Sequence, residues 1–296
     1  MKATGYFLAV ISAVTYGLIP LFILPVKAQG LSLDVTLFYR FGISALLLLA
    51  LLLYKKESLK VSFRSLLLLA ALGLLFALSS EFLFLAYDYL SAGIASTILF
   101  VYPVIVVLIM VFFFKERITP LTWISLLIAL SGIGLLSIKG SIAEISLAGL
   151  LTALFSALCY ALYIVIVNKS NTGVSGIKLA FYSILFSSFY YLLKSLWNKE
   201  SLLLPDSGWL IHIALFGLLT SVISITTLVY AIRYIGSTPV SIMGAMEPVV
   251  AVFISSAFFG EPLTTQLLTG MVLILAGVIL NIVADHSQQK VLKENS

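Results

Sequence analysis

The sequence predicts an all-α integral membrane protein in which ten transmembrane helices form two inverted-topology repeats of five helices each. Three observations support this prediction. The 296 residues are 61% hydrophobic and only 10% charged, and their mean hydropathy is +1.18. The apolar residues form long runs between short polar connectors, and the two halves of the chain resemble each other. Because a soluble domain carries about 25% charged residues, the composition excludes a soluble globular enzyme.

Ten apolar runs have the length of a membrane-spanning helix. A span of about 20 helical residues crosses the roughly 30 Å hydrocarbon core of a bilayer. The connectors, such as Lys55–Ser58, are too short to form a soluble domain, so the function must lie within the helical bundle. We expect spans at residues 5–25, 34–54, 65–87, 93–114, 119–138, 147–167, 177–197, 208–231, 239–259 and 264–284.

The basic residues are distributed unevenly across the predicted membrane. With the N-terminus inside, twelve Lys and Arg residues lie on the inner side and four on the outer side. Cytoplasmic loops of membrane proteins are enriched in Lys and Arg. We therefore expect a multi-pass protein of the cytoplasmic membrane with both termini cytoplasmic. The same bias accounts for the net charge of +5, and nucleic acid is not an expected partner.

The two halves of the chain align without a gap over their later spans. An offset of 145 residues places Ala86–Ile138 on Ala231–Val283 and brings Pro103 onto Pro248. Each half has five spans, and because five is odd, the second half enters the membrane from the opposite face. Inverted repeats of this kind are typical of secondary transporters, which bind substrate at the repeat interface near the midplane.

These repeats define the expected domain boundaries. The first five-helix repeat covers residues 1–138, and the second covers residues 147–285. Residues 286–296 are polar and are expected to form a disordered cytoplasmic tail.

Matched motifs in the two halves resemble a known family. The first half has Tyr-Pro at 102–103 followed by Phe-Lys-Glu-Arg-Ile-Thr at 114–119. The second has Glu-Pro at 247–248 followed by Phe-Gly-Glu-Pro-Leu-Thr at 259–264. This doubled pattern resembles the EamA-type permeases of the drug/metabolite transporter superfamily. The resemblance implies ten helices in a 5+5 inverted repeat, and export or exchange of small metabolites such as amino acids, amines or drugs.

Three ionisable residues stand out within the predicted spans: Arg40, Glu81 and Glu247. Such groups are costly in lipid and generally face a partner or a wet cavity. Arg40 and Glu81 lie roughly 9 Å from the outer ends of consecutive helices. One interpretation is a structural ion pair between them, and the other is that Arg40 binds a substrate carboxylate or that Glu81 cycles a proton. The two interpretations are not exclusive, because an ion pair can open when substrate arrives.

Glu247 lies near the midplane, directly before Pro248. Irregular backbone at this depth is tolerated where it is buried in protein or lines a wet cavity. Glu247 is therefore a candidate for holding a substrate ammonium or for titrating as a coupling proton site. The alternative is a structural glutamate bonded to backbone groups that the proline frees.

Three tyrosines are further candidates for the substrate site. Tyr102 is the repeat equivalent of Glu247, and Tyr16 and Tyr160 occupy the first helix of each half. We expect them to line the cavity, although aromatic residues in spans also serve in packing and interface belts.

Paired residues at helix ends and bends complete the candidates. Pro103 and Pro248 are predicted kink points for gating. Glu116 and Glu261 occupy equivalent helix ends and are expected to cap or pair locally.

The residues argue against other chemistries. The chain has one cysteine and two histidines, and it lacks metal-binding and phosphate-loop motifs. We therefore expect no metal, no cofactor and no enzymatic activity.

The sequence predicts a secondary transporter that moves a small-molecule substrate across the bilayer by alternating access. Proton coupling and facilitated diffusion both remain open, as does the oligomeric state. The alternatives are a channel-like facilitator, or a membrane scaffold or lipid-modifying protein.

Overall fold

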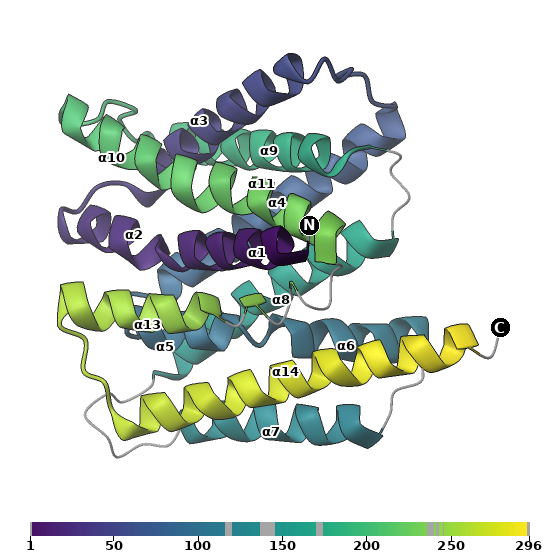
Figure 1. Cartoon of the computed structure of the whole chain (residues 1–296). Helices are drawn as coiled ribbons and strands as arrows, with labels where there is room; N and C mark the ends of the chain where they lie inside the picture. The colour runs from purple at the N-terminus through teal and green to yellow at the C-terminus, as the bar shows by residue number, and fades with distance from the viewer. Residues whose placement is uncertain are drawn as a thin grey trace.

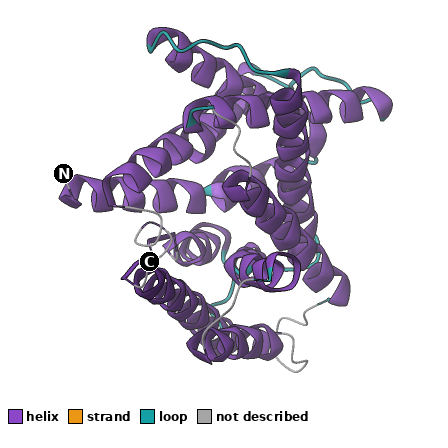
Figure 2. Cartoon of the chain, turned by 90° about the vertical axis from the view of Figure 1, so that its right-hand side faces the viewer, coloured by secondary structure: helices purple, strands orange, loops and turns teal. Residues whose placement is uncertain are grey.

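The computed structural model describes residues 2–115, 120–136, 146–169, 174–235, 240, 243–244 and 246–294. Within these residues the chain consists of helices joined by loops and contains no strand (Figure 2). The helices are α1 (Lys2–Gly17), α2 (Ile19–Ala28), α3 (Leu33–Tyr54), α4 (Phe63–Ala86), α5 (Ala92–Leu99), α6 (Tyr102–Phe114), α7 (Pro120–Leu136), α8 (Leu147–Lys169), α9 (Gly176–Trp197), α10 (Ser207–Gly217), the π-helix η1 (Leu218–Ile223), α11 (Ser224–Ile235), α13 (Met246–Phe259) and α14 (Thr265–Glu294).

Several of these helices are suited to crossing a bilayer. Within the described residues, seven helical segments are long and apolar enough: Ala3–Ala28, Leu33–Tyr54, Phe63–Ala86, Ala92–Phe114, Leu147–Val167, Gly176–Trp197 and Ser207–Leu228. Shorter apolar helices cover Pro120–Leu135, Met246–Phe259 and Thr265–Leu280, where the other three predicted spans lie. The chain is a multi-pass helical membrane protein.

Proline divides two of the predicted spans into consecutive helices. Pro20 is in the first turn of α2, immediately after α1 ends at Gly17. Pro103 is in the first turn of α6, after α5 ends at Leu99. Proline has no backbone N–H and its ring obstructs the preceding turn, so it is tolerated mainly at a helix start. Both spans are thus interrupted partway through.

Serine side chains define where four helices begin. Ser32, Ser62, Ser91 and Ser175 precede α3, α4, α5 and α9, and each hydroxyl accepts a backbone N–H from three residues further on. Such caps satisfy donors that a helix N-terminus leaves free.

The helices pack in pairs, and α7 lies along α14 at one edge of the bundle (Figure 1). Glycine allows this pair to approach closely. A Cβ at Gly132 would lie 2.9 Å from the Gly270 carbonyl oxygen, and one at Gly277 would lie 2.7 Å from the Ser125 carbonyl oxygen. These glycines therefore pack helices within one chain, as small residues commonly do in membranes.

The predicted disorder of the C-terminal tail is wrong for most of its length. α14 continues from its apolar part to Glu294, so the polar residues from 286 onward extend the helix. Adding residues to an existing helix avoids the cost of nucleation. Polarity alone therefore did not identify the end of this helix.

Candidate functional site

A small cavity of about 30 Å³, partly open to its surroundings, lies where several helix ends meet. It is lined by both sides of the α1–α2 interruption, both sides of the α5–α6 interruption, and the start of α13. α4 and α8 supply further walls. Interrupted helices at membrane depth generally surround a substrate or ion site, because their freed backbone groups need a polar environment.

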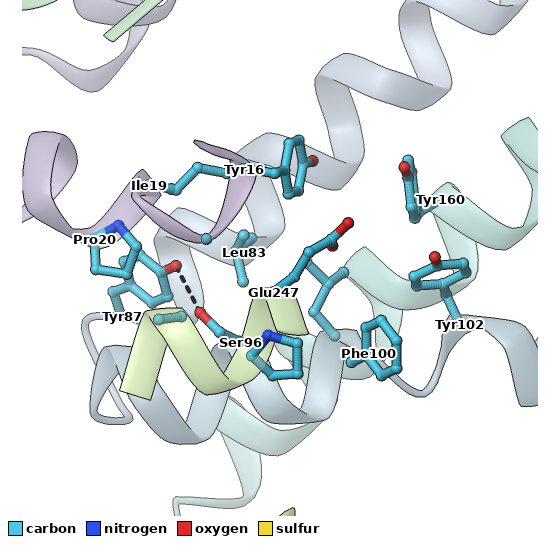
Figure 3. A pocket seen from close by; sticks show the side chains of 14 residues that line it. Tyr16, Ile19, Pro20, Leu83, Tyr87, Ser96, Phe100, Tyr102, Tyr160 and Glu247 are labelled. Carbon is cyan, nitrogen blue, oxygen red and sulfur yellow. Dashed lines mark hydrogen bonds between the residues drawn. The ribbon is translucent and has the colours of Figure 1, made fainter. Parts of the chain in front are cut away.

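Four of the six predicted substrate-binding residues line this cavity: Tyr16, Tyr102, Tyr160 and Glu247. They come from α1, α6, α8 and α13, so both halves of the chain contribute. Figure 3 shows the Glu247 carboxylate directed between the three tyrosine side chains. Residues more than 200 positions apart in the sequence thus meet at one point.

Glu247 is the only charged side chain among the described residues that line the cavity. It is the second residue of α13, where the helix dipole favours a negative charge. No described residue donates a hydrogen bond to its carboxylate. Pro248, the next residue, is buried and also lines the cavity.

A close contact between α1 and α13 holds Glu247 in place. A Cβ at Gly17 would lie 2.7 Å from Cβ of Val250 and 2.8 Å from the backbone oxygen of Glu247. Only glycine permits this approach without displacement of one helix. The first turn of α13 is therefore positioned by the last residue of α1.

The aromatic side chains pack against one another around the carboxylate. The Tyr102 and Tyr160 rings are 4.7 Å apart between centroids and cross at 80°, and Phe100 meets Tyr102 at 5.7 Å and 80°. Edge-to-face pairs of this kind are favourable because the ring edge is positive and the ring face negative. The contacts fix the orientation of the cavity wall.

Two polar lining residues were not among the sequence candidates. The Tyr87 hydroxyl and the Ser96 hydroxyl lie 3.2 Å apart and share a hydrogen bond across the wall of the cavity (Figure 3). In the sequence they are polar residues near helix ends, with no pattern that separates them from others of that kind.

Arg40 does not line the cavity. It is only 1% exposed, and its Nη2 donates to the Thr220 hydroxyl at 3.0 Å. Its guanidinium carbon lies 4.1 Å from the ring centroid of Phe216 and 5.0 Å from that of Phe41. Thr220 belongs to the π-helical segment η1, which the sequence analysis did not predict. No described residue accepts a hydrogen bond from Arg40 Nε.

Of the alternatives that the sequence left open for Arg40 and Glu81, the mutual ion pair is wrong. Glu81 instead accepts hydrogen bonds from Lys194 at 2.6 Å and from Tyr190 at 2.9 Å. Lys194 also reaches Asp34 at 3.0 Å. α4 packs against α9, so the last turn of α9 brings Lys194 to Glu81, whereas Arg40 is directed toward η1.

Glu261, the one of the two helix-end glutamates that is described, caps a helix of the other half of the chain and not its own helix. Glu261 accepts the backbone N–H groups of Ala92 at 2.7 Å and Gly93 at 3.1 Å, and so caps the start of α5. Glu116 lies outside the described residues.

Pro103 follows the α5–α6 interruption but does not line the cavity. Among the described residues, no group of three or more His, Cys, Asp or Glu side chains could hold a metal ion.

Comparison with known proteins confirms the resemblance found in the sequence. The EamA-like transporter family matches residues 3–138 and again residues 147–283. The uncharacterized transporter YvbV of Bacillus subtilis (strain 168) is 29% identical over 196 residues, 65% of this chain and 64% of that protein. The match thus spans slightly less than two thirds of this relative. The uncharacterized transporter YxxF of the same organism is 26% identical over 82% of this chain and 78% of its own length.

A solved crystal structure shares the fold. It covers 97% of this chain and 99% of its own, with a TM-score of 0.68 and 18% sequence identity. At this level of identity the likeness concerns the fold alone.

Proposed function

This chain belongs to the EamA-like transporter family, and we propose that it is a secondary transporter whose substrate binds in the cavity at Glu247. The substrate is a small metabolite, exported or exchanged across the cytoplasmic membrane by alternating access. One observation carries the proposal. A carboxylate without a described partner projects into a cavity where two helix interruptions meet the start of α13. Taking a charge out of water without a partner is costly, so we infer that a ligand supplies the missing contact.

Alternating access requires two halves that exchange roles, and we propose ten spans in two inverted repeats. Equivalent backbone positions support this arrangement. Lys56 and Lys199, which an offset of 143 residues aligns, both adopt left-handed conformations, with φ of 53° and 56°. Lys115 and Gly260, which an offset of 145 aligns, do the same, with φ of 55° and 68°. Left-handed conformations are uncommon outside glycine, so their recurrence at matched positions favours a true repeat.

Reciprocal contacts support the inversion of the second repeat. The Ser32 hydroxyl donates to Glu200 at 2.6 Å, and the equivalent Ser175 hydroxyl donates to Glu57 at 2.6 Å. The first bond joins the start of α3 to the end of α9, and the second joins the end of α3 to the start of α9. These equivalent helices therefore run antiparallel, and each half makes the same contact to the other, as in a two-fold arrangement.

The direction of insertion and the coupling follow from charge. The bias of twelve basic residues to four favours cytoplasmic positions for both termini. For coupling, Glu247 is the only charged lining residue in the part of the chain that the structure describes, so a proton and a cationic group of the substrate would compete for it. We propose proton antiport on this basis. Flux that ignores an imposed pH gradient would leave facilitated diffusion.

The experiment is uptake into proteoliposomes from a labelled panel of amino acids, polyamines and cationic drugs, with and without a pH gradient. Glu247→Gln is compared with wild type and with Glu57→Gln, which makes the same chemical change in a connector outside the cavity. We expect saturable uptake of one class by wild type and Glu57→Gln, and its loss in Glu247→Gln. Saturable uptake by Glu247→Gln at the wild-type rate would refute this site. Flux that does not saturate would favour a channel.

A further inference from the structure

We propose that the substrate is an organic cation, an ammonium carrying alkyl or aryl groups, held by Glu247 and by the faces of the surrounding tyrosine rings. This inference rests on the proposed function, because it names the substrate class of the same cavity. The inference goes beyond the proposed function by selecting cations over zwitterions, anions and neutral solutes.

The charge of the cavity is the first argument. Its polar lining consists of one carboxylate, Glu247, and the hydroxyl groups of Tyr16, Tyr87, Tyr102, Tyr160 and Ser96. No Lys, Arg or His is among the described lining residues. A carboxylate removed from water is stabilised by a nearby positive charge, and within the described residues no cationic side chain provides one. A cationic ligand would complete the pair.

The aromatic wall is the second argument. Tyr102 and Tyr160 meet edge to face beside the carboxylate, and Phe100 continues the wall from the α5 side. The face of an aromatic ring is negative and attracts cations, and alkylated ammonium groups are commonly bound in aromatic cages. A carboxylate surrounded by rings therefore provides both a charge partner and an apolar surface for the carbon groups of such a ligand.

The position of Arg40 is the third argument, because it decides against a zwitterion. A substrate carboxylate would need a cationic partner at the cavity wall. Arg40 is the residue that the sequence analysis proposed for this role. Its side chain is directed at Phe216 and Thr220, and Arg40 is not among the residues that line the cavity. The described wall thus offers an anionic partner for a positive group and no cationic partner for a carboxylate.

The test measures binding to the purified protein separately from transport. The probes are benzyltrimethylammonium, its neutral carbon isostere neopentylbenzene, and the zwitterion phenylalanine, each titrated by isothermal calorimetry in lipid nanodiscs. We expect benzyltrimethylammonium to bind at least tenfold more tightly than either of the others. Glu247→Gln should weaken this binding at least tenfold, whereas Glu57→Gln should leave it unchanged.

A pair of tyrosine variants separates the ring face from simple packing. Tyr102→Leu should weaken cation binding more than Tyr102→Phe, because phenylalanine retains the ring face. Circular dichroism and size-exclusion profiles establish that each variant is folded. Tighter binding of phenylalanine or of neopentylbenzene, equal losses in the two Tyr102 variants, or no cation binding by folded wild type would each overturn the inference.

The two proposals fail in different ways. Saturable, Glu247-dependent uptake of a zwitterion would overturn the cation inference and leave the transporter intact. Cation binding at Glu247 without uptake or exchange would support the cation inference and refute the transport function.

Discussion

The contact between Gly17 and α13 offers a sharp test of how the candidate site is held together. In Gly17→Ala the new methyl group would lie 2.7 Å from Cβ of Val250 and 2.8 Å from the backbone oxygen of Glu247. Comfortable carbon–carbon contact begins near 3.5 Å, so α13 must move by about 0.8 Å or remain strained. Overpacking of this kind costs about 1–3 kcal/mol. The displaced turn is the one that carries Glu247.

The matched control is Gly134→Ala. Gly134 lies in α7, and a Cβ there would meet nothing within 4 Å. Alanine is a better helix former than glycine by up to about 1 kcal/mol, so this control should be neutral or slightly stabilising. The difference in unfolding free energy between the two variants isolates the steric cost, and we expect it to be about 1–3 kcal/mol.

The assay is thermal unfolding of purified protein, followed by ligand binding at a temperature where both variants are folded. We expect Gly17→Ala to melt several degrees below Gly134→Ala and to bind ligand more weakly, because the carboxylate has moved relative to the tyrosine rings. Equal melting temperatures and equal affinities in the two variants would refute the claim that this contact positions Glu247.

Two further predictions concern the charged groups outside the cavity. The Glu81–Lys194 pair is about a quarter to a third exposed. A double-mutant cycle with Glu81→Gln and Lys194→Gln should therefore give a coupling energy of only about 1 kcal/mol. A coupling near zero in denaturation experiments would contradict this prediction. Arg40→Met removes a buried charge that has no ion-pair partner among the described residues, so it should cost less stability than loss of a paired buried charge, and uptake should persist. Loss of uptake by folded Arg40→Met protein would instead return Arg40 to the substrate site.

Much of the arrangement followed from patterns visible in the sequence. Pro103 and Pro248 align in the two halves, and the residues beside them, Tyr102 and Glu247, line one cavity in the structure. A proline within an apolar run carries its own physical signal, because it disturbs the helix wherever it occurs. The functional role of these residues stays a prediction until the uptake and binding experiments are performed.

The parts that sequence reasoning missed depend on side-chain direction and on helix packing. Charge and depth alone suggested that Arg40 and Glu81 would pair, but the packing of α4 on α9 brings Lys194 to Glu81. Arg40 donates a hydrogen bond to Thr220 in a π-helical segment, and the sequence of this segment has no recognisable signature of a π-helix. An apolar span predicts that a helix exists, and it does not predict where that helix widens or which neighbour it meets.

The most direct test of the central claim is counterflow in proteoliposomes. Vesicles preloaded with unlabelled substrate receive labelled substrate outside, and wild type is compared with Glu247→Gln at matched protein density. The account predicts that internal substrate accelerates entry of label through wild type, because an alternating-access carrier returns faster when loaded, and that Glu247→Gln shows no acceleration. Equal acceleration in both proteins would contradict the claim that Glu247 binds the substrate.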